Sequence, residues 1–215
     1  MKLVKTLSVL LLIYTAAAGI LLEVPRLPIL NETIRVLYFH VPMWFTMIFL
    51  LLLSSVNAYK FISTKNIKYD LISYNYAHVG VYFGVLGIVT GMIWANYTWG
   101  TFWTNDPKLN GSAIGLLIYF GYFVLRNSLE DESKKAKVSS VYSVFAFSML
   151  IPLIFILPRL TDSLHPGNGG NPGFNVYDLN SQLRLVFYPA VIGFICLGLW
   201  IANIKFKLLK LTDKR

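Results

Sequence analysis

The stretch that decides the fold is VPMWFTMIFLLLLSSVNAYKFI, residues 41–62. Its first charged side chain is Lys60, so its apolar run approaches the roughly 20 residues that a helix needs to cross a bilayer. Five further stretches have this character, and the six together cover residues 4–22, 41–62, 71–95, 112–129, 139–157 and 183–204. We therefore predict an all-α integral membrane protein, with a single six-helix transmembrane domain over residues 1–215.

The composition agrees with a membrane protein and leaves no room for a soluble domain. Hydrophobic residues make up 56% of the 215 positions, charged residues only 13%, and the mean hydropathy is +0.59. The apolar runs are continuous rather than alternating, which argues against membrane strands. The net charge of +9 does not by itself indicate nucleic-acid binding. In a membrane protein, the basic residues have to be assigned to the two sides of the membrane before their charge is interpreted.

The basic residues predict the orientation of the chain. If the N-terminus is cytoplasmic, the other side receives few of the 19 Lys and Arg residues, namely Arg26, Arg35, Lys108, Arg159 and Arg184. Since short loops rich in Lys and Arg stay inside, both termini are predicted to be cytoplasmic. The first segment resembles a signal peptide, but its apolar run continues to Leu22, so we expect it to be retained as a helix.

Function is expected in the three outward segments, 23–40, 96–111 and 158–182, which are longer than the inward loops and hold two of the three histidines. We expect a short helix along the membrane surface over 32–40, followed by a turn at Val41–Pro42. That turn would place His40 at a corner beside the outer surface of the bilayer. The Gly- and Asn-rich residues 166–173 are expected to form a flexible loop.

His40 and His165 are the candidate metal ligands. Neutral imidazole is a common axial ligand of heme iron, and two such groups on opposite sides of the iron would bind heme without a covalent tether. The alternative is that each is an interfacial polar residue. His78 lies inside the third helix, where we favour a hydrogen-bonded packing role over a functional one. The single cysteine, Cys196, excludes a Cys-x-x-Cys-His motif for covalent heme attachment.

The densest aromatic cluster lies in the second outward segment and consists of Trp94, Tyr97, Trp99, Phe102 and Trp103, around Gly100. One interpretation is an interfacial belt, because Trp and Tyr collect at bilayer surfaces in many membrane proteins. The other is an outward-facing tryptophan-rich loop that forms a platform for a flat apolar macrocycle.

Three short segments carry a family resemblance. Residues 99–106, WGTFWTND, resemble the tryptophan-rich "WWD" signature of heme-handling proteins of cytochrome c biogenesis. Residues 34–42, IRVLYFHVP, resemble the segment with the first axial histidine in the CcmC branch of that family, and residues 163–167, SLHPG, are similar to the segment with the second. Phe102 and Asn105 stand where the family pattern usually has tryptophan.

The resemblance implies a function and a set of functional residues. His40 and His165 would be the axial ligands of the iron, and the heme-contacting loop would consist of Trp99, Gly100, Thr101, Phe102, Trp103 and Asp106. The cargo would be heme b, bound non-covalently and in transit through a bacterial inner-membrane protein that is not an enzyme. The implied partners are a periplasmic heme chaperone of the CcmE type, a CcmD-like small membrane protein and CcmA/CcmB-type transporter subunits, with no nucleic acid.

Arg159 and Arg184 are candidates for the two heme propionates, because Arg can grip a carboxylate with two parallel hydrogen bonds. Their alternative role is ordinary snorkelling at helix ends. Asp106 and Lys108 are expected to pair locally and shape the aromatic loop; the alternatives are that Asp106 contacts a partner or orients a ligand. Two other functions stay open: a bis-histidine b-type cytochrome for electron transfer, and a small transporter whose aromatics only mark the interface.

Overall fold

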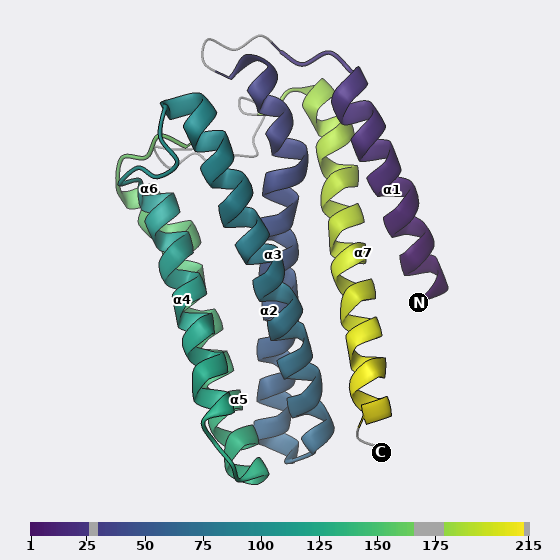
Figure 1. Ribbon diagram of the computed structural model, residues 1–215, viewed down its shortest axis with the longest axis vertical. Helices are drawn as coiled ribbons and strands as arrows, with labels where there is room; N and C mark the ends of the chain where they lie inside the picture. Colours follow the sequence, from purple (N-terminus) through teal and green to yellow (C-terminus); the bar gives the residue numbers. More distant parts are fainter. Residues whose placement is uncertain (26–29, 166–178, 213–215) are drawn as a thin grey trace.

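The structure, a computed structural model, describes residues 1–25, 30–165 and 179–212 (Figure 1). Its elements are α1 (Lys2–Leu21), the 3-10 helix η1 (Asn31–Val36), α2 (Leu37–Thr64), α3 (Ile67–Trp99), α4 (Pro107–Asn127), α5 (Glu132–Ile151), the π-helical η2 (Pro152–Ile156), α6 (Leu157–Leu160) and α7 (Ser181–Thr212). Within these residues, six helical stretches are long and apolar enough to cross a membrane, which confirms the predicted fold class. Arg26 and the segment 166–173 lie outside the described residues.

The paired helices α2 and α3 form the centre of the bundle. Figure 1 shows α4 and α5 on one side of this pair, with α7 and then α1 on the other. Met47, Leu50 and Leu51 of α2 are fully buried and share one core cluster with Val79 and Phe83 of α3. Close van der Waals packing of these side chains fixes which faces of the two helices meet.

Glycines on α3 bring α2 unusually close. A Cβ added at Gly84 would lie 2.6 Å from Met47 Sδ, and one at Gly87 would lie 2.8 Å from Trp44 Cε2. Small residues at this spacing allow membrane helices to approach closely. The same stripe ends at Gly91, where an added Cβ would lie 2.8 Å from His40 Cε1, so His40 lies against the backbone of α3.

The predicted surface helix over 32–40 and the turn at Val41–Pro42 are wrong. η1 passes directly into α2 at Leu37, and Pro42 lies inside α2. The reason is packing: Ile34 and Tyr38 are buried in a cluster with Phe187 of α7, and this burial outweighs the extended bias of the residue before proline. His40 is therefore a residue of the first turns of α2.

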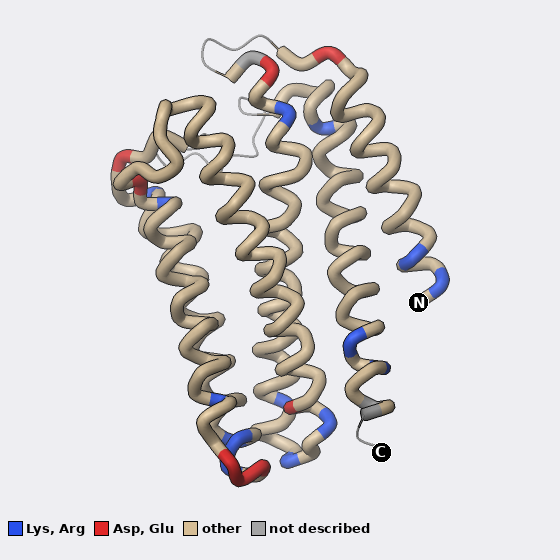
Figure 2. Tube along the Cα trace, viewed as in Figure 1, with Lys and Arg blue, Asp and Glu red and all other residues tan. Residues whose placement is uncertain are grey.

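The two ends of the bundle differ in character. We call the end where α2 joins α3 and α4 joins α5 the lysine end, and the opposite end, with His40 and His165, the histidine end. Figure 2 shows that Lys and Arg gather towards the lysine end. Asp70 and Arg126 lie there too, in the first turn of α3 and the last turn of α4, and form a buried ion pair.

Candidate functional site

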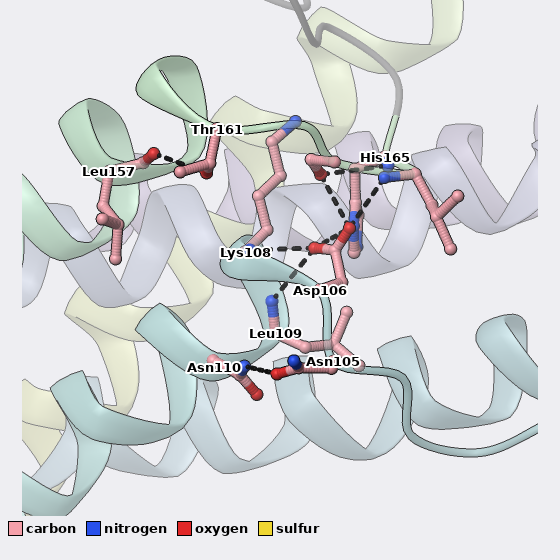
Figure 3. Close-up of polar contacts among 10 residues, drawn as sticks. Asn105, Asp106, Lys108, Leu109, Asn110, Leu157, Thr161 and His165 are labelled. Carbon is pink, nitrogen blue, oxygen red and sulfur yellow. Dashed lines mark hydrogen bonds and ion pairs between the residues drawn. The ribbon is translucent and has the colours of Figure 1, made fainter.

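His165 follows α6 and contacts a buried carboxylate (Figure 3). Its Nδ1 lies 2.9 Å from Asp106 Oδ1. Because an ionised carboxylate only accepts hydrogen bonds, Nδ1 carries the proton and the lone pair resides on Nε2. Histidines that bind metals are commonly oriented in this way, with the second nitrogen donating to a carboxylate.

Asp106 joins two segments that are far apart in the sequence. It caps α4 by accepting from the backbone N–H of Lys108 at 2.8 Å and of Leu109 at 3.4 Å. Its Oδ2 accepts from Ser163 Oγ at 2.8 Å and from the backbone N–H of Leu164 at 2.7 Å. Its side chain is only 1% exposed, and its contacts are with His165, the His165 loop and the start of α4.

The charge state of Asp106 follows from these contacts. Burial alone would raise the pKa of its carboxyl, but the hydrogen bonds from His165, Ser163 and Leu164 hold that pKa well below its ordinary value of 3.8. Asp106 is therefore an anion at neutral pH. Its contacts connect His165 and Leu164 to the start of α4, and its role in orienting a ligand stays a prediction.

Two tryptophans of the last turns of α3 pack around His165. The Trp99 ring lies 4.9 Å from the imidazole, at an interplanar angle of 75°, and the Trp94 ring lies 6.0 Å from it. The two indoles also contact each other edge to face, at 5.1 Å. Trp94 is 9% exposed and belongs to the site, although the sequence indicated it only as a member of the aromatic cluster.

His40 approaches the same helix from α2. Its Nδ1 lies 3.0 Å from Thr90 Oγ1, and that oxygen is 2.8 Å from the carbonyl of Leu86. Since the Thr90 hydroxyl can donate its one proton to this carbonyl, it accepts from His40 Nδ1–H, which again leaves the lone pair on Nε2. Thr90 and Gly91 were not predicted as site residues, because sequence alone does not show which face of α3 meets α2.

The two histidines thus converge on one stretch of α3. His40 lies against Gly91 and His165 against Trp94, three residues further along, and a charge on one histidine is felt at the other. Neither Nε2 atom makes a hydrogen bond within the part of the chain that the structure describes. In both histidines Nδ1 is engaged by a neighbouring side chain, and both rings lie near this stretch of α3.

The predicted aromatic loop divides into a buried and an exposed part. α3 ends at Gly100, whose φ of 78° favours glycine, so Trp99 belongs to the helix rather than to a loop. Thr101 Oγ1 donates to the carbonyl of Trp103 at 3.2 Å and shapes the turn. Phe102 and Trp103 are 53% and 40% exposed, so of the predicted loop only Trp99 and Asp106 contact His165.

Asn105 takes part in polar contacts rather than in an aromatic platform. Its Oδ1 accepts from Asn110 Nδ2 at 2.7 Å (Figure 3). It also lines a hollow of about 210 Å³ together with Thr104, Asp106, Pro107, Asp162, Ser163 and Leu164. A tryptophan at this position would fill part of this open hollow.

The two predicted propionate partners differ in availability. Arg159 Nη1 donates to the carbonyl of Phe155 at 2.9 Å, and its guanidinium lies over the Phe155 ring, so this side chain is already held by its own helix. Arg184 lies in the first turn of α7, and its buried Nε has no hydrogen-bond partner among the described residues. Arg184 is the better candidate for a carboxylate partner.

His78 lies away from this site, on a face of α3 towards α4 and α7. Its ring is 4.8 Å from Tyr82, 5.2 Å from Phe123 and 5.6 Å from Tyr74. It packs as predicted, but the expected hydrogen bond is missing at Nδ1, which is buried without a partner among the described residues. Lys205 Nζ lies over the Tyr74 and Tyr82 rings, the same two rings that contact His78, and makes cation–π contacts with both.

Comparison with known proteins places the chain in a family. A family model described as heme exporter protein C, CcmC, matches residues 1–214. The chain belongs to the CcmC family. It is 27% identical over 145 residues to heme exporter protein C of Haemophilus influenzae and 30% identical over 120 residues to that of Paracoccus denitrificans. A cytochrome c biogenesis protein CcsA of Prochlorococcus marinus is 42% identical over 65 residues, which is 30% of this chain and 21% of that protein.

This CcmC-family chain spans about half the length of several curated relatives that it matches. The aligned region covers 65% of this chain and 56% of the Haemophilus protein, and 54% of this chain and 50% of the Paracoccus protein. Membership of the family rests on a match along nearly the whole chain, residues 1–214. The activity of the longer relatives is carried over to this chain only as a proposal.

Proposed function

We propose that this CcmC-family protein holds heme b non-covalently between His40 and His165 and passes it to a periplasmic heme chaperone for the maturation of c-type cytochromes. The observation that carries the proposal is the pair of imidazoles over one stretch of α3, each with Nδ1 engaged and Nε2 free. Heme iron has two axial positions, and a neutral imidazole Nε2 suits each of them.

The donor set favours heme over a bare metal ion. A structural zinc site, for example, takes four protein ligands, whereas heme iron needs only two, because the porphyrin supplies the others. Among the described residues, no group of three or more His, Cys, Asp or Glu side chains is positioned to hold an ion. Two histidines without further ligands therefore fit heme, and Arg184 is the residue we assign to a propionate.

The aromatic residues fall into two groups, one that packs beside His165 and one that is exposed. Trp94 and Trp99 support His165 from one side. Phe102, Trp103 and Tyr97 are exposed, and they offer apolar rings to the macrocycle or to a chaperone that takes it. This exposure, and the position of His165 outside the long helices, favours cargo in transit over a resident electron-transfer heme.

The proposed orientation has the histidine end outside the cytoplasmic membrane and both termini in the cytoplasm. Support comes from the Lys and Arg residues gathered at the other end (Figure 2). CcmA/CcmB-type subunits and a CcmD-like protein would be neighbours in the membrane. The sequence has no Gly-x-x-x-x-Gly-Lys motif, so any ATP hydrolysis falls to such partners.

An absorption spectrum of the detergent-purified protein, made in cells that supply heme, tests the proposal. Six-coordinate low-spin heme is expected, and His40→Ala and His165→Ala should each abolish that signal. His78→Ala is the matched control and should retain it. A six-coordinate spectrum that survives both ligand substitutions would exclude the paired-ligand site, and a wild-type protein that never binds heme would exclude the function.

A bis-histidine b-type cytochrome is the second candidate, since the same ligand pair would serve it. Quinol separates the two. A heme in transit should not be reduced by quinol on the time scale of turnover and should leave with an added chaperone, whereas an electron carrier should cycle with quinol and keep its heme.

A further inference from the structure

We propose that the two axial ligands are unequal: Asp106 acts as a positioning residue that makes His165 the stronger, electron-donating ligand, and His40 is the weaker ligand that leaves the iron first. This inference rests on the proposed function. It concerns the hydrogen-bond partner of Nδ1 in each histidine, Asp106 for His165 and Thr90 for His40. The two partners differ in charge, in burial and in the number of hydrogen bonds that fix them.

Behind His165 stands a buried anion. Asp106 Oδ1 lies 2.9 Å from His165 Nδ1, and the carboxylate is 1% exposed. Further hydrogen bonds, from Ser163, Leu164, Lys108 and Leu109, fix the position of the carboxylate. A carboxylate that accepts the Nδ1 proton gives the imidazole partial imidazolate character, which strengthens donation from Nε2 to a metal.

Behind His40 stands a neutral hydroxyl. Thr90 Oγ1 lies 3.0 Å from His40 Nδ1, and its own proton goes to the backbone of α3. Such a bond orients the ring but brings no negative charge. The ring also makes a hydrogen bond to the neutral backbone of Gly87, and it packs against Gly91 and edge-on to Trp44 at 6.3 Å. His40 is therefore held in place without being made a stronger base.

This difference has an electronic consequence for the bound heme. Ferric heme carries one more positive charge than ferrous heme, so a buried anion one imidazole away stabilises the ferric state more. Removing the charge of Asp106 should favour the ferrous state and raise the midpoint potential. It should also weaken the His165–iron bond, because outer partners of a ligating histidine typically contribute 10–100-fold in metal affinity.

The difference also sets the order in which ligands leave. If heme were handed over by exchange of one protein ligand at a time, one of the two histidines would have to release it first. We expect His40 to bind the iron more weakly than His165, because the partner of its Nδ1 is the neutral hydroxyl of Thr90. In the His40→Ala protein, His165 alone should still hold five-coordinate heme, whereas the His165→Ala protein should retain much less heme.

The decisive experiment is a potentiometric titration of the heme-loaded full chain with Asp106→Asn and, as the matched change on the other side, Thr90→Val. A tenfold preferential loss of ferric affinity in Asp106→Asn would raise the midpoint potential by about 59 mV for this one-electron couple. Thr90→Val should shift it by clearly less. Asp106→Glu, which keeps the carboxylate, should lie nearer the wild type than Asp106→Asn does.

A double-mutant cycle on heme affinity separates positioning from a merely structural role. If Asp106 acts through His165, Asp106→Asn should cost little further affinity in a His165→Ala background. Equal costs in both backgrounds, or equal shifts of the midpoint potential for Asp106→Asn and Thr90→Val, would overturn the inference. Either result leaves the paired-ligand function standing, because that function is judged by the His40 and His165 substitutions alone.

Discussion

Two buried aspartates occupy opposite ends of the bundle, and their partners differ. Asp70 at the lysine end forms two bonds with Arg126, Oδ1 with Nη1 at 2.7 Å and Oδ2 with Nη2 at 2.6 Å, and the side chains are 3% and 7% exposed. Asp106 at the histidine end shares its oxygens between His165, two residues of the His165 loop and the start of α4.

The comparison teaches that the partner decides what a buried carboxylate does. Arg is always protonated and has only donors, so the Asp70–Arg126 pair satisfies itself and links α3 to α4. Histidine has a second nitrogen whose lone pair stays free, so the influence of Asp106 passes through the ring to whatever binds Nε2. One pair is structural, and the other is proposed to tune a ligand.

The largest expected effect is the loss of Arg126. Arg126→Ala would leave Asp70 buried without its counter-ion, which should destabilise the fold by roughly 3–5 kcal/mol. The double variant Asp70→Leu/Arg126→Leu should recover most of this loss, because no uncompensated charge remains. Thermal unfolding in detergent measures both, and the folded fraction should keep its six-coordinate heme. A changed heme spectrum in the folded double variant would contradict the inference that the Asp70–Arg126 pair has no influence on the heme site.

The next effect concerns His40, which has no carboxylate partner and lies against the backbone of α3 at Gly91. In Gly91→Ala the new Cβ would lie 2.8 Å from His40 Cε1, so the ring must move. Overpacking of this kind costs about 1–3 kcal/mol, and here it should also convert the heme from six- to five-coordinate. Gly84→Ala is the control, since its Cβ meets Met47 Sδ at 2.6 Å and should destabilise without changing the spectrum. The same spectrum in both variants would count against a ligand at His40.

A smaller effect, roughly 1 kcal/mol, is expected for Asp106→Asn in the heme-free protein, because Asn can still cap α4. The folded-state pKa of Asp106 is depressed, so its stabilising contribution is complete above the unfolded value near 3.8 and is lost as pH falls through the lower folded value. The free energy of unfolding, measured against pH, should therefore be higher for the wild type than for Asp106→Asn at neutral pH. The two values should converge only below about pH 4. A gap independent of pH would contradict this.

The sequence predicted the six membrane helices well, because long apolar runs carry that signal locally. It did not predict the connection of η1 to α2, since the burial of Tyr38 is a tertiary contact that outweighs the local bias at Val41. His40 and His165 were named from their positions in the outward segments and from the resemblance. Their supports at Thr90, Gly91 and Ser163 were not, because pairing α2 and the His165 loop with α3 and α4 requires contacts between segments far apart in the sequence.

The smallest expected effect is at Phe102, where the family pattern usually has tryptophan. Phe102 is 53% exposed, whereas Trp99 lies 4.9 Å from His165. Phe102→Trp should leave stability within about 0.5 kcal/mol of the wild type and leave the midpoint potential of the heme unchanged. Trp99→Leu, its matched partner, should shift the heme spectrum because it removes the ring beside His165. If Phe102→Trp moved the potential as far as Asp106→Asn, the electronic character of the site would come from the exposed loop, and the distinction between the two buried aspartates would lose its functional meaning.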